Sequence, residues 1–137
     1  MSTLRARAGA VVSVMVKGVS TTTNVATANL SQQNKTFSQS VLPVQTGTSV
    51  SFPNFDTVRH HVYSFSPIKT FELRLYAGTP AAPVVFDKAG TATLGCNIHD
   101  KMAAYVVVVD TPWSAISQSD GVARIADVPT GDYQLQL

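Results

Sequence analysis

The only cysteine of this chain lies in a short segment that also carries a histidine and a methionine. Cys96, His99 and Met102 follow one another in the pattern C-x-x-H-x-x-M. A thiolate, an imidazole and a thioether form a soft donor set, which suits copper cycling between Cu(I) and Cu(II). A tight loop between two strands would fold the three side chains back onto one point. The pattern therefore predicts a copper site.

The fourth ligand must come from a neighbouring strand. The two remaining histidines, His60 and His61, are adjacent in a separate β-rich stretch. Neighbouring residues of a strand point to opposite faces, so only one of them can face the metal. Two His and one Cys with a distant axial Met form the blue-copper arrangement. We therefore expect one copper ion, held by His60 or His61 together with the three clustered residues.

Cysteine and histidine also serve in other kinds of site. A lone buried cysteine is most often a small hydrophobe, but here every Cys and His falls in two short segments. A structural zinc site usually has more Cys or His and seldom a Met. A catalytic Cys–His pair needs an orienting group and an oxyanion hole. Asn97 and Asp100 lie close by, but nothing else supports hydrolysis, so we expect no enzymatic activity.

The elements that must position these residues are predicted to be strands. Short apolar or alternating runs are separated by Gly, Pro, Asn and Asp, which is typical of a β-sandwich or barrel. No stretch has the pattern of a convincing amphipathic helix. Turns are expected at Thr46-Gly47 and Asp120-Gly121. The expected strands cover residues 11–16, 41–44, 48–52, 59–65, 71–76, 84–86, 91–94 and 104–109.

Two of these runs carry more specific expectations. Residues 106–109 are four consecutive valines, which predicts a strand that is buried on both faces. Residues 71–76 alternate, which predicts a half-buried strand. The alternation puts Phe71, Leu73 and Leu75 on one face and Glu72, Arg74 and Tyr76 on the other.

Composition narrows the class of protein. The chain has 137 residues, of which 45% are hydrophobic and 13% charged, and its net charge is +2. The apolar content argues against disorder, and the charge is too small to indicate nucleic-acid binding. No apolar run approaches the ~20 residues that a membrane-spanning helix needs. One cysteine excludes an intramolecular disulfide.

The ligand motif and the strands around it resemble the cupredoxins, the blue copper proteins. The resemblance covers about residues 30–112 and is carried by Gly95-Cys96-Asn97-Ile98-His99-Asp100-Lys101-Met102 with His60-His61-Val62. The short loop is similar to that of amicyanin, and the two segments resemble bacterial plastocyanin-like or methylamine utilisation proteins. The resemblance implies a Greek-key β-sandwich or barrel and electron transfer. The resemblance also implies that His60 is the upstream ligand. The sequence departs from the family pattern at Gly95, where cupredoxins often have an aromatic residue.

Both ends of the chain extend beyond this resemblance. We expect an N-terminal β-segment at residues 1–22, a cupredoxin domain at 23–112 and a C-terminal β-hairpin segment at 113–137. Residues 119–133 resemble the end of a carboxypeptidase regulatory-like module. The two end segments are too short for an ordinary separate domain, so they could pair with each other. The uncharged alternating run at 134–137 is an edge that invites self-association.

These observations lead to one main hypothesis and two alternatives. The main hypothesis is a blue copper electron carrier that acts with a redox partner protein in the periplasm or outside the cell. The first alternative is a self-assembling structural β-protein that contains a copper site. The second is a copper storage or delivery protein, which would need a more exposed and exchangeable site.

Overall fold

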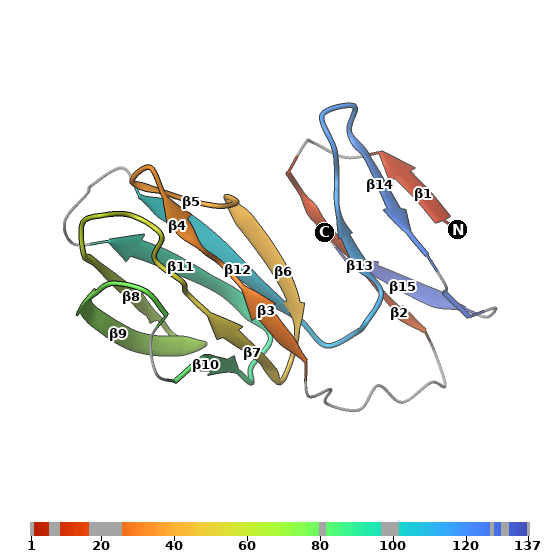
Figure 1. Cartoon of the computed structure of the whole chain (residues 1–137). Helices are drawn as coiled ribbons and strands as arrows, with labels where there is room; N and C mark the ends of the chain where they lie inside the picture. Colours follow the sequence, from red (N-terminus) through yellow and green to blue (C-terminus); the bar gives the residue numbers. More distant parts are fainter. Residues whose placement is uncertain are drawn as a thin grey trace.

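A computed structural model describes residues 2–5, 9–16, 26–79, 82–96, 102–126, 128–129 and 132–136. Every regular element in these parts of the chain is a β-strand, which confirms the expected all-β class. They contain no helix that could cross a membrane. Figure 1 shows the strands gathered into two units that lie side by side.

The larger unit consists of two facing sheets. The five-stranded sheet has the order β6 (Val41–Gln45), β12 (Ala103–Val109), β11 (Gly90–Cys96), β8 (His60–Ser66) and β9 (Lys69–Tyr76). The three-stranded sheet has the order β10 (Val84–Phe86), β7 (Thr48–Ser51) and β3 (Thr27–Asn29). Most neighbouring strands are antiparallel, but β12 runs parallel to β6 and β3 runs parallel to β7. Each sheet buries one face in a shared core that includes Leu30, Phe52, Phe86, Leu94 and Val106.

A short hairpin, which the sequence pattern did not indicate, lies beside this sandwich (Figure 1). It pairs β4 (Gln32–Gln33) with β5 (Thr36–Phe37). The turn residues Asn34 and Lys35 have φ of 55° and 58°. Positive φ at both central positions is the geometry of a type I′ turn. Each strand has only two residues, and three of the four residues are polar. Such short strands show no periodicity in the sequence.

The valine-rich strand β12 is buried on one face only. Val106 and Val108 are buried in the core, whereas Val107 and Val109 on the other face are partly exposed. The expectation of burial on both faces is therefore wrong. Four consecutive valines suggested burial on both faces. Successive side chains of the strand still point to opposite faces, however, and the sandwich core lies on only one side of β12.

The face of Tyr76 was also predicted wrongly. His60 pairs with Tyr76 while Val62 pairs with Leu73, so β9 holds one extra residue between these two pairs. This β-bulge reverses the alternation of the strand beyond it. As a result Tyr76 packs against the core, on the side of Leu73, and not with Glu72 on the outer face.

The smaller unit is built from both ends of the chain. One sheet has the order β13 (Ser114–Ile116), β2 (Val11–Val16) and β15 (Tyr133–Gln136), and a second pairs β1 (Ser2–Arg5) with β14 (Val122–Ile125). Its core consists of Val12, Val14, Val16, Ala123 and Ile125. Residues at opposite ends of the sequence therefore pair beside the sandwich. The Asp120-Gly121 turn connects β13 and β14, and Gly121 has a φ of 78°.

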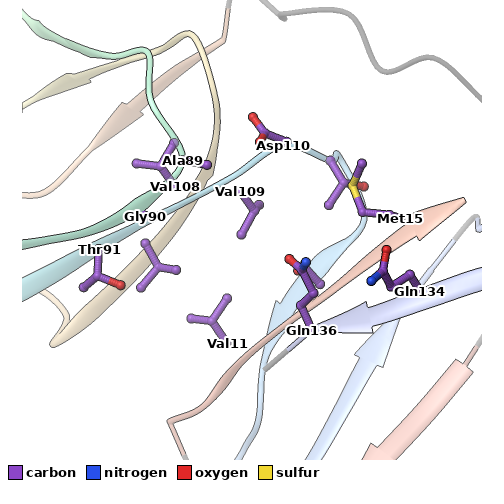
Figure 2. A pocket seen from close by; sticks show the side chains of 13 residues that line it. Val11, Met15, Ala89, Gly90, Thr91, Val108, Val109, Asp110, Gln134 and Gln136 are labelled. Carbon is purple, nitrogen blue, oxygen red and sulfur yellow. The ribbon is translucent and has the colours of Figure 1, made fainter. Parts of the chain in front are cut away.

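A hollow of about 390 Å³ separates the two units (Figure 2). Val107 and Val109 of β12 line it from the sandwich, and Ser13, Gln134 and Gln136 line it from the smaller unit. It contains no cysteine or histidine. The hollow's residues on β12 lie at the C-terminal end of that strand, from which the chain enters the smaller unit. Met102 precedes the opposite end of β12. The outward valines of β12 thus face the smaller unit and not the core.

The burial of Tyr76 makes the stability of the fold depend on pH in the alkaline range. The Tyr76 hydroxyl donates to the Phe52 carbonyl at 2.8 Å and bonds the side chain of the fully buried Gln32. Burial raises the pKa of Tyr76 to about 12 from 10.0; the Gln32 hydrogen bond opposes this shift, and the negative charge of a Cys96 thiolate adds to it. Between pH 10 and 12 the unfolded phenol loses its proton while the folded one keeps it. Stability must therefore fall as the pH rises through this window.

The check is a spectrophotometric phenol titration combined with urea unfolding. We expect one of the four tyrosines to ionise about two pH units later than the others. Tyr76→Phe should remove this late step and flatten the loss of stability between pH 10 and 12. Ionisation of all four phenols in one step near pH 10 would contradict the assignment.

Candidate metal centre

Three of the predicted ligands lie at one end of the five-stranded sheet. His60 is the first residue of β8, Cys96 is the last residue of β11, and Met102 directly precedes β12. In the antiparallel pairing of β8 with β11, Cys96 is opposite Val62. His60 lies two residues from Val62 and so points to the same face. The pleat and the register together aim His60 and Cys96 at the interior.

The two donors meet inside the sandwich. The Cys96 Sγ and the His60 Nδ1 are 3.6 Å apart, and His60 is fully buried. Two ligands that share one tetrahedral ion with metal–sulfur and metal–nitrogen bonds of about 2.3 and 2.0 Å lie roughly 3.5 Å apart. The observed separation therefore fits a first-row transition metal bound between them.

Met102 and His61 differ in their relation to this pair. Met102 is buried and lines, together with Cys96, a hollow of about 290 Å³. His61 points to the outer face of the sheet, where its Nε2 lies 3.7 Å from the Glu72 Oε2 and its ring meets Tyr63 edge to face. The structure thus brings His60 to Cys96 and turns His61 away.

The predicted ligand His99 lies outside the described residues, as do residues 97–101 in general. Within the part of the chain that is described, no group of three or more Cys, His, Asp and Glu side chains could hold a metal ion. Ligation by the full set of His60, Cys96, His99 and Met102 accordingly stays a prediction.

Asp56 is a functional candidate that the sequence analysis missed. Its Oδ2 lies 2.7 Å from the His60 Nε2, on the side of the imidazole that faces away from Cys96. A carboxylate only accepts hydrogen bonds, so the His60 Nε2 carries the proton and donates it. This assigns the tautomer in which the Nδ1 lone pair is directed at the Cys96 side.

The hairpin turn holds the carboxylate of Asp56 in place. The backbone amide of Asn34 donates to the Oδ1 of Asp56 at 2.6 Å, and the backbone amide of Lys35 donates to the Oδ2 at 2.8 Å. Burial by itself would raise the pKa of Asp56, but the hydrogen bonds from His60, Lys35 and Asn34 outweigh it and lower the pKa below 3.8. Asp56 is therefore ionised at neutral pH.

A weak signal for this arrangement is present in the sequence. Asn adopts positive φ more readily than most residues, so Asn34 between two short polar runs is compatible with a tight turn. Asp56 is an acidic residue four positions before a buried histidine. Neither feature indicates that the turn and the loop touch, because that contact depends on the tertiary fold.

Asn54 fixes the loop that carries Asp56. Its side-chain amide donates to the carbonyls of Val58 and Tyr76 at 3.0 and 2.9 Å, and its Oδ1 accepts from the Asp56 amide at 2.9 Å. Asn54 itself is almost fully buried. One buried amide therefore anchors the loop to the end of β9, beside the start of β8.

Tyr63 covers the backbone next to the cysteine. A Cβ atom added to Gly95 would lie 2.7 Å from the Tyr63 Oη and 2.8 Å from its Cζ. Gly95 and Tyr63 are cross-strand partners of β11 and β8. Glycine at this position lets the phenol ring of Tyr63 lie directly over the strand that ends at Cys96.

The comparisons with known proteins agree on the fold. A copper-containing nitrite reductase from Thermus scotoductus matches 64% of this chain at 21% identity and a TM-score of 0.55. A purple cupredoxin from Nitrosopumilus maritimus matches 60% at 23% identity and 0.51, and amicyanin from Paracoccus versutus matches 71% at 15% identity and 0.51. The match spans 23% of the nitrite reductase but 99% and 98% of the two smaller proteins.

No protein-family model matches the chain, and no curated protein does. Identities of 15–23% show the fold alone. The expected cupredoxin-like, amicyanin-like sandwich is thereby confirmed.

The close approach of Tyr63 to Gly95 leads to a test by paired substitution. We expect Gly95→Ala to destabilise the metal-free protein by about 0.5–1 kcal/mol, because the new methyl group must displace the phenol ring of Tyr63, which is only half-buried. In a Tyr63→Leu background the same substitution should cost much less, since leucine does not reach the glycine. Urea unfolding of the single and double variants measures this coupling.

A matched control uses the tyrosine on the next strand. Tyr105 pairs with Thr93 and not with Gly95, so Tyr105→Leu should leave the cost of Gly95→Ala unchanged. Simple additivity of the Gly95 and Tyr63 substitutions would show that the contact has no energetic weight.

Proposed function

We propose that this chain binds one copper ion through His60, Cys96, His99 and Met102 and carries single electrons to or from a redox partner protein. The single observation that carries the proposal is the 3.6 Å approach of the His60 Nδ1 to the Cys96 Sγ at the buried end of the sheet. The spacing of the four donors and the cupredoxin-like fold support it. We place this activity in the periplasm or outside the cell, as the family resemblance suggests.

Copper, when bound, supplies a couple between Cu(I) and Cu(II) at a soft sulfur and imidazole site. The chain's own part is to keep the donors fixed. His60 and Cys96 come from two neighbouring strands of one sheet, so the backbone ladder sets their separation. Asp56 holds the imidazole in one tautomer and one orientation. A site that does not rearrange between oxidation states favours fast electron exchange.

The burial of these donors also distinguishes electron transfer from copper delivery. Cys96 is 4% exposed and Met102 is 3% exposed. A protein that hands over its metal needs ligands that an acceptor can reach, whereas an electron carrier needs a dry and rigid site. The burial therefore favours the carrier, and we expect slow loss of copper to a chelator.

The optical spectrum of the copper-loaded protein tests the proposal. We expect an intense blue absorption from thiolate-to-Cu(II) charge transfer, which Cys96→Ser should abolish because the thiolate is its source. His60→Ala should greatly weaken copper binding and shift the band. The neighbouring substitution His61→Ala is the matched control and should preserve both colour and affinity, since His61 faces Glu72.

Two outcomes would count against this assignment. A colourless Cu(II) form of the folded protein would remove the blue-copper proposal. Loss of colour in His61→Ala with retention in His60→Ala would mean that the structure has identified the wrong histidine.

A second candidate function, self-association, rests on strand β15. Among the described strands β15 lies at an edge of its sheet, and Leu135 on it is 52% exposed. Residues 133–136 carry no charge, and charged side chains are a common means of protecting an edge. This arrangement favours pairing with the same strand of a second copy.

Light scattering over a range of concentrations checks the self-association. We expect the weight-average mass to rise with concentration, and Leu135→Lys to hold the protein at the monomer mass. Since Leu135 is not at the metal centre, this variant should keep the copper spectrum. A wild-type chain that stays monomeric throughout would exclude this second function.

A further inference from the structure

We propose that the Asn34-Lys35 turn and Asp56 form a relay that positions His60 and sets its strength as a copper ligand. The inference rests on the proposed copper site and adds to it a set of residues outside the ligands. Asp56 is here a positioning residue, since it acts on the metal only through the His60 imidazole.

The directions of the hydrogen bonds determine how the His60 ring is held. Three donors converge on the two oxygens of Asp56: the Asn34 amide on Oδ1, and the Lys35 amide and the His60 Nε2 on Oδ2. The carboxylate is only 11% exposed and the His60 side chain is not exposed at all. The imidazole is therefore held by its far nitrogen, with its Nδ1 3.6 Å from the Cys96 Sγ.

Backbone groups, rather than mobile side chains, fix the carboxylate of Asp56. Both amide donors belong to one tight turn whose two central residues have positive φ. The hairpin is tied in turn to the loop of Asp56: the Gln32 amide donates to the Pro53 carbonyl at 2.8 Å, and the Phe55 amide donates to the Gln32 carbonyl at 2.8 Å. These hydrogen bonds restrict the movement of Asp56 relative to the His60 imidazole.

The Asp56 carboxylate also affects how strongly His60 donates to a metal. A carboxylate that accepts the far N–H of a ligating histidine makes the other nitrogen a stronger donor, and loss of such a partner typically weakens metal binding 10–100-fold. The additional negative charge favours Cu(II) over Cu(I). The two turn amides share that charge, so the hairpin moderates how much of it reaches His60.

Asp56→Asn is the decisive variant because an asparagine cannot satisfy this set of donors. Its single oxygen replaces one of the two acceptors, and its NH₂ group then confronts at least one N–H of the turn or of His60. The volume of the side chain hardly changes. The matched control is Asp120→Asn, which removes the same charge from a carboxylate that accepts from the Val122 amide at 2.9 Å in the smaller unit.

Two measurements test the relay. In the metal-free protein, nitrogen NMR shifts of the imidazoles should show His60 protonated at Nε2 in the wild type and in Asp120→Asn, but mixed tautomers in Asp56→Asn. In the copper-loaded protein, Asp56→Asn should bind Cu(II) roughly 10–100-fold more weakly and have a higher reduction potential. A tenfold loss confined to Cu(II) corresponds to a rise of about 59 mV.

The turn is tested separately through Lys35. Lys35→Gly keeps the backbone amide and readily adopts positive φ, so the His60 Nε2 should remain protonated as in the wild type. Lys35→Pro removes the amide donor and excludes that φ, so it should shift the tautomer in the same direction as Asp56→Asn. If Lys35→Pro fails to fold, the comparison of Asp56→Asn with Asp120→Asn still decides.

The outcomes separate this proposal from the proposed function. A wild-type protein that binds no copper would overturn the copper proposal, while the tautomer measurement would still support or refute the positioning of His60. Unchanged tautomer, affinity and potential in a blue Asp56→Asn protein would overturn the relay and leave the copper site intact.

Discussion

Burial of the His60 imidazole imposes the constraint that organises this end of the molecule. A ring that is fully withdrawn from water must find partners for its nitrogens inside the protein. Asp56 supplies one and Cys96 approaches the other. Asp56 is itself charged and partly exposed, and the backbone amides of Asn34 and Lys35 donate to its carboxylate. Each group in this series is thus held in place by the next one.

The same constraint accounts for irregular features in the sheet. The bulge of β9 lies opposite the start of β8, where His60 enters the interior. By reversing the alternation, it turns Tyr76 inward, and the Tyr76 hydroxyl then meets the buried Gln32 that begins the hairpin. The hairpin is thus held from both sides, by the loop of Asp56 and by the bulged end of β9. A regular β9 would have left Gln32 without this partner.

The sequence alone predicted the features that depend on neighbouring residues. Each expected run overlaps a strand, and the segments with Cys96 and His60 stand out because they contain every Cys and His. What it did not predict depends on contacts between distant residues. Asp56 looks like an ordinary loop carboxylate until the turn at Asn34 is placed against it. Tyr76 was assigned to the outer face because the sequence pattern does not indicate a bulge. Val107 was expected to be buried because a run of four valines shows no polar alternation.

Strand β12 shows how one element serves both units. Its first half follows Met102 and completes the sheet next to Cys96, while Val107 and Val109 in its second half face the smaller unit across a hollow. Directly after it, the Thr111 hydroxyl donates to the Val14 carbonyl at 2.6 Å and ties the connection to β2. The smaller unit is therefore attached at the end of β12 away from the ligands. The contacts of His60 with Asp56 and Cys96 are made within the larger unit.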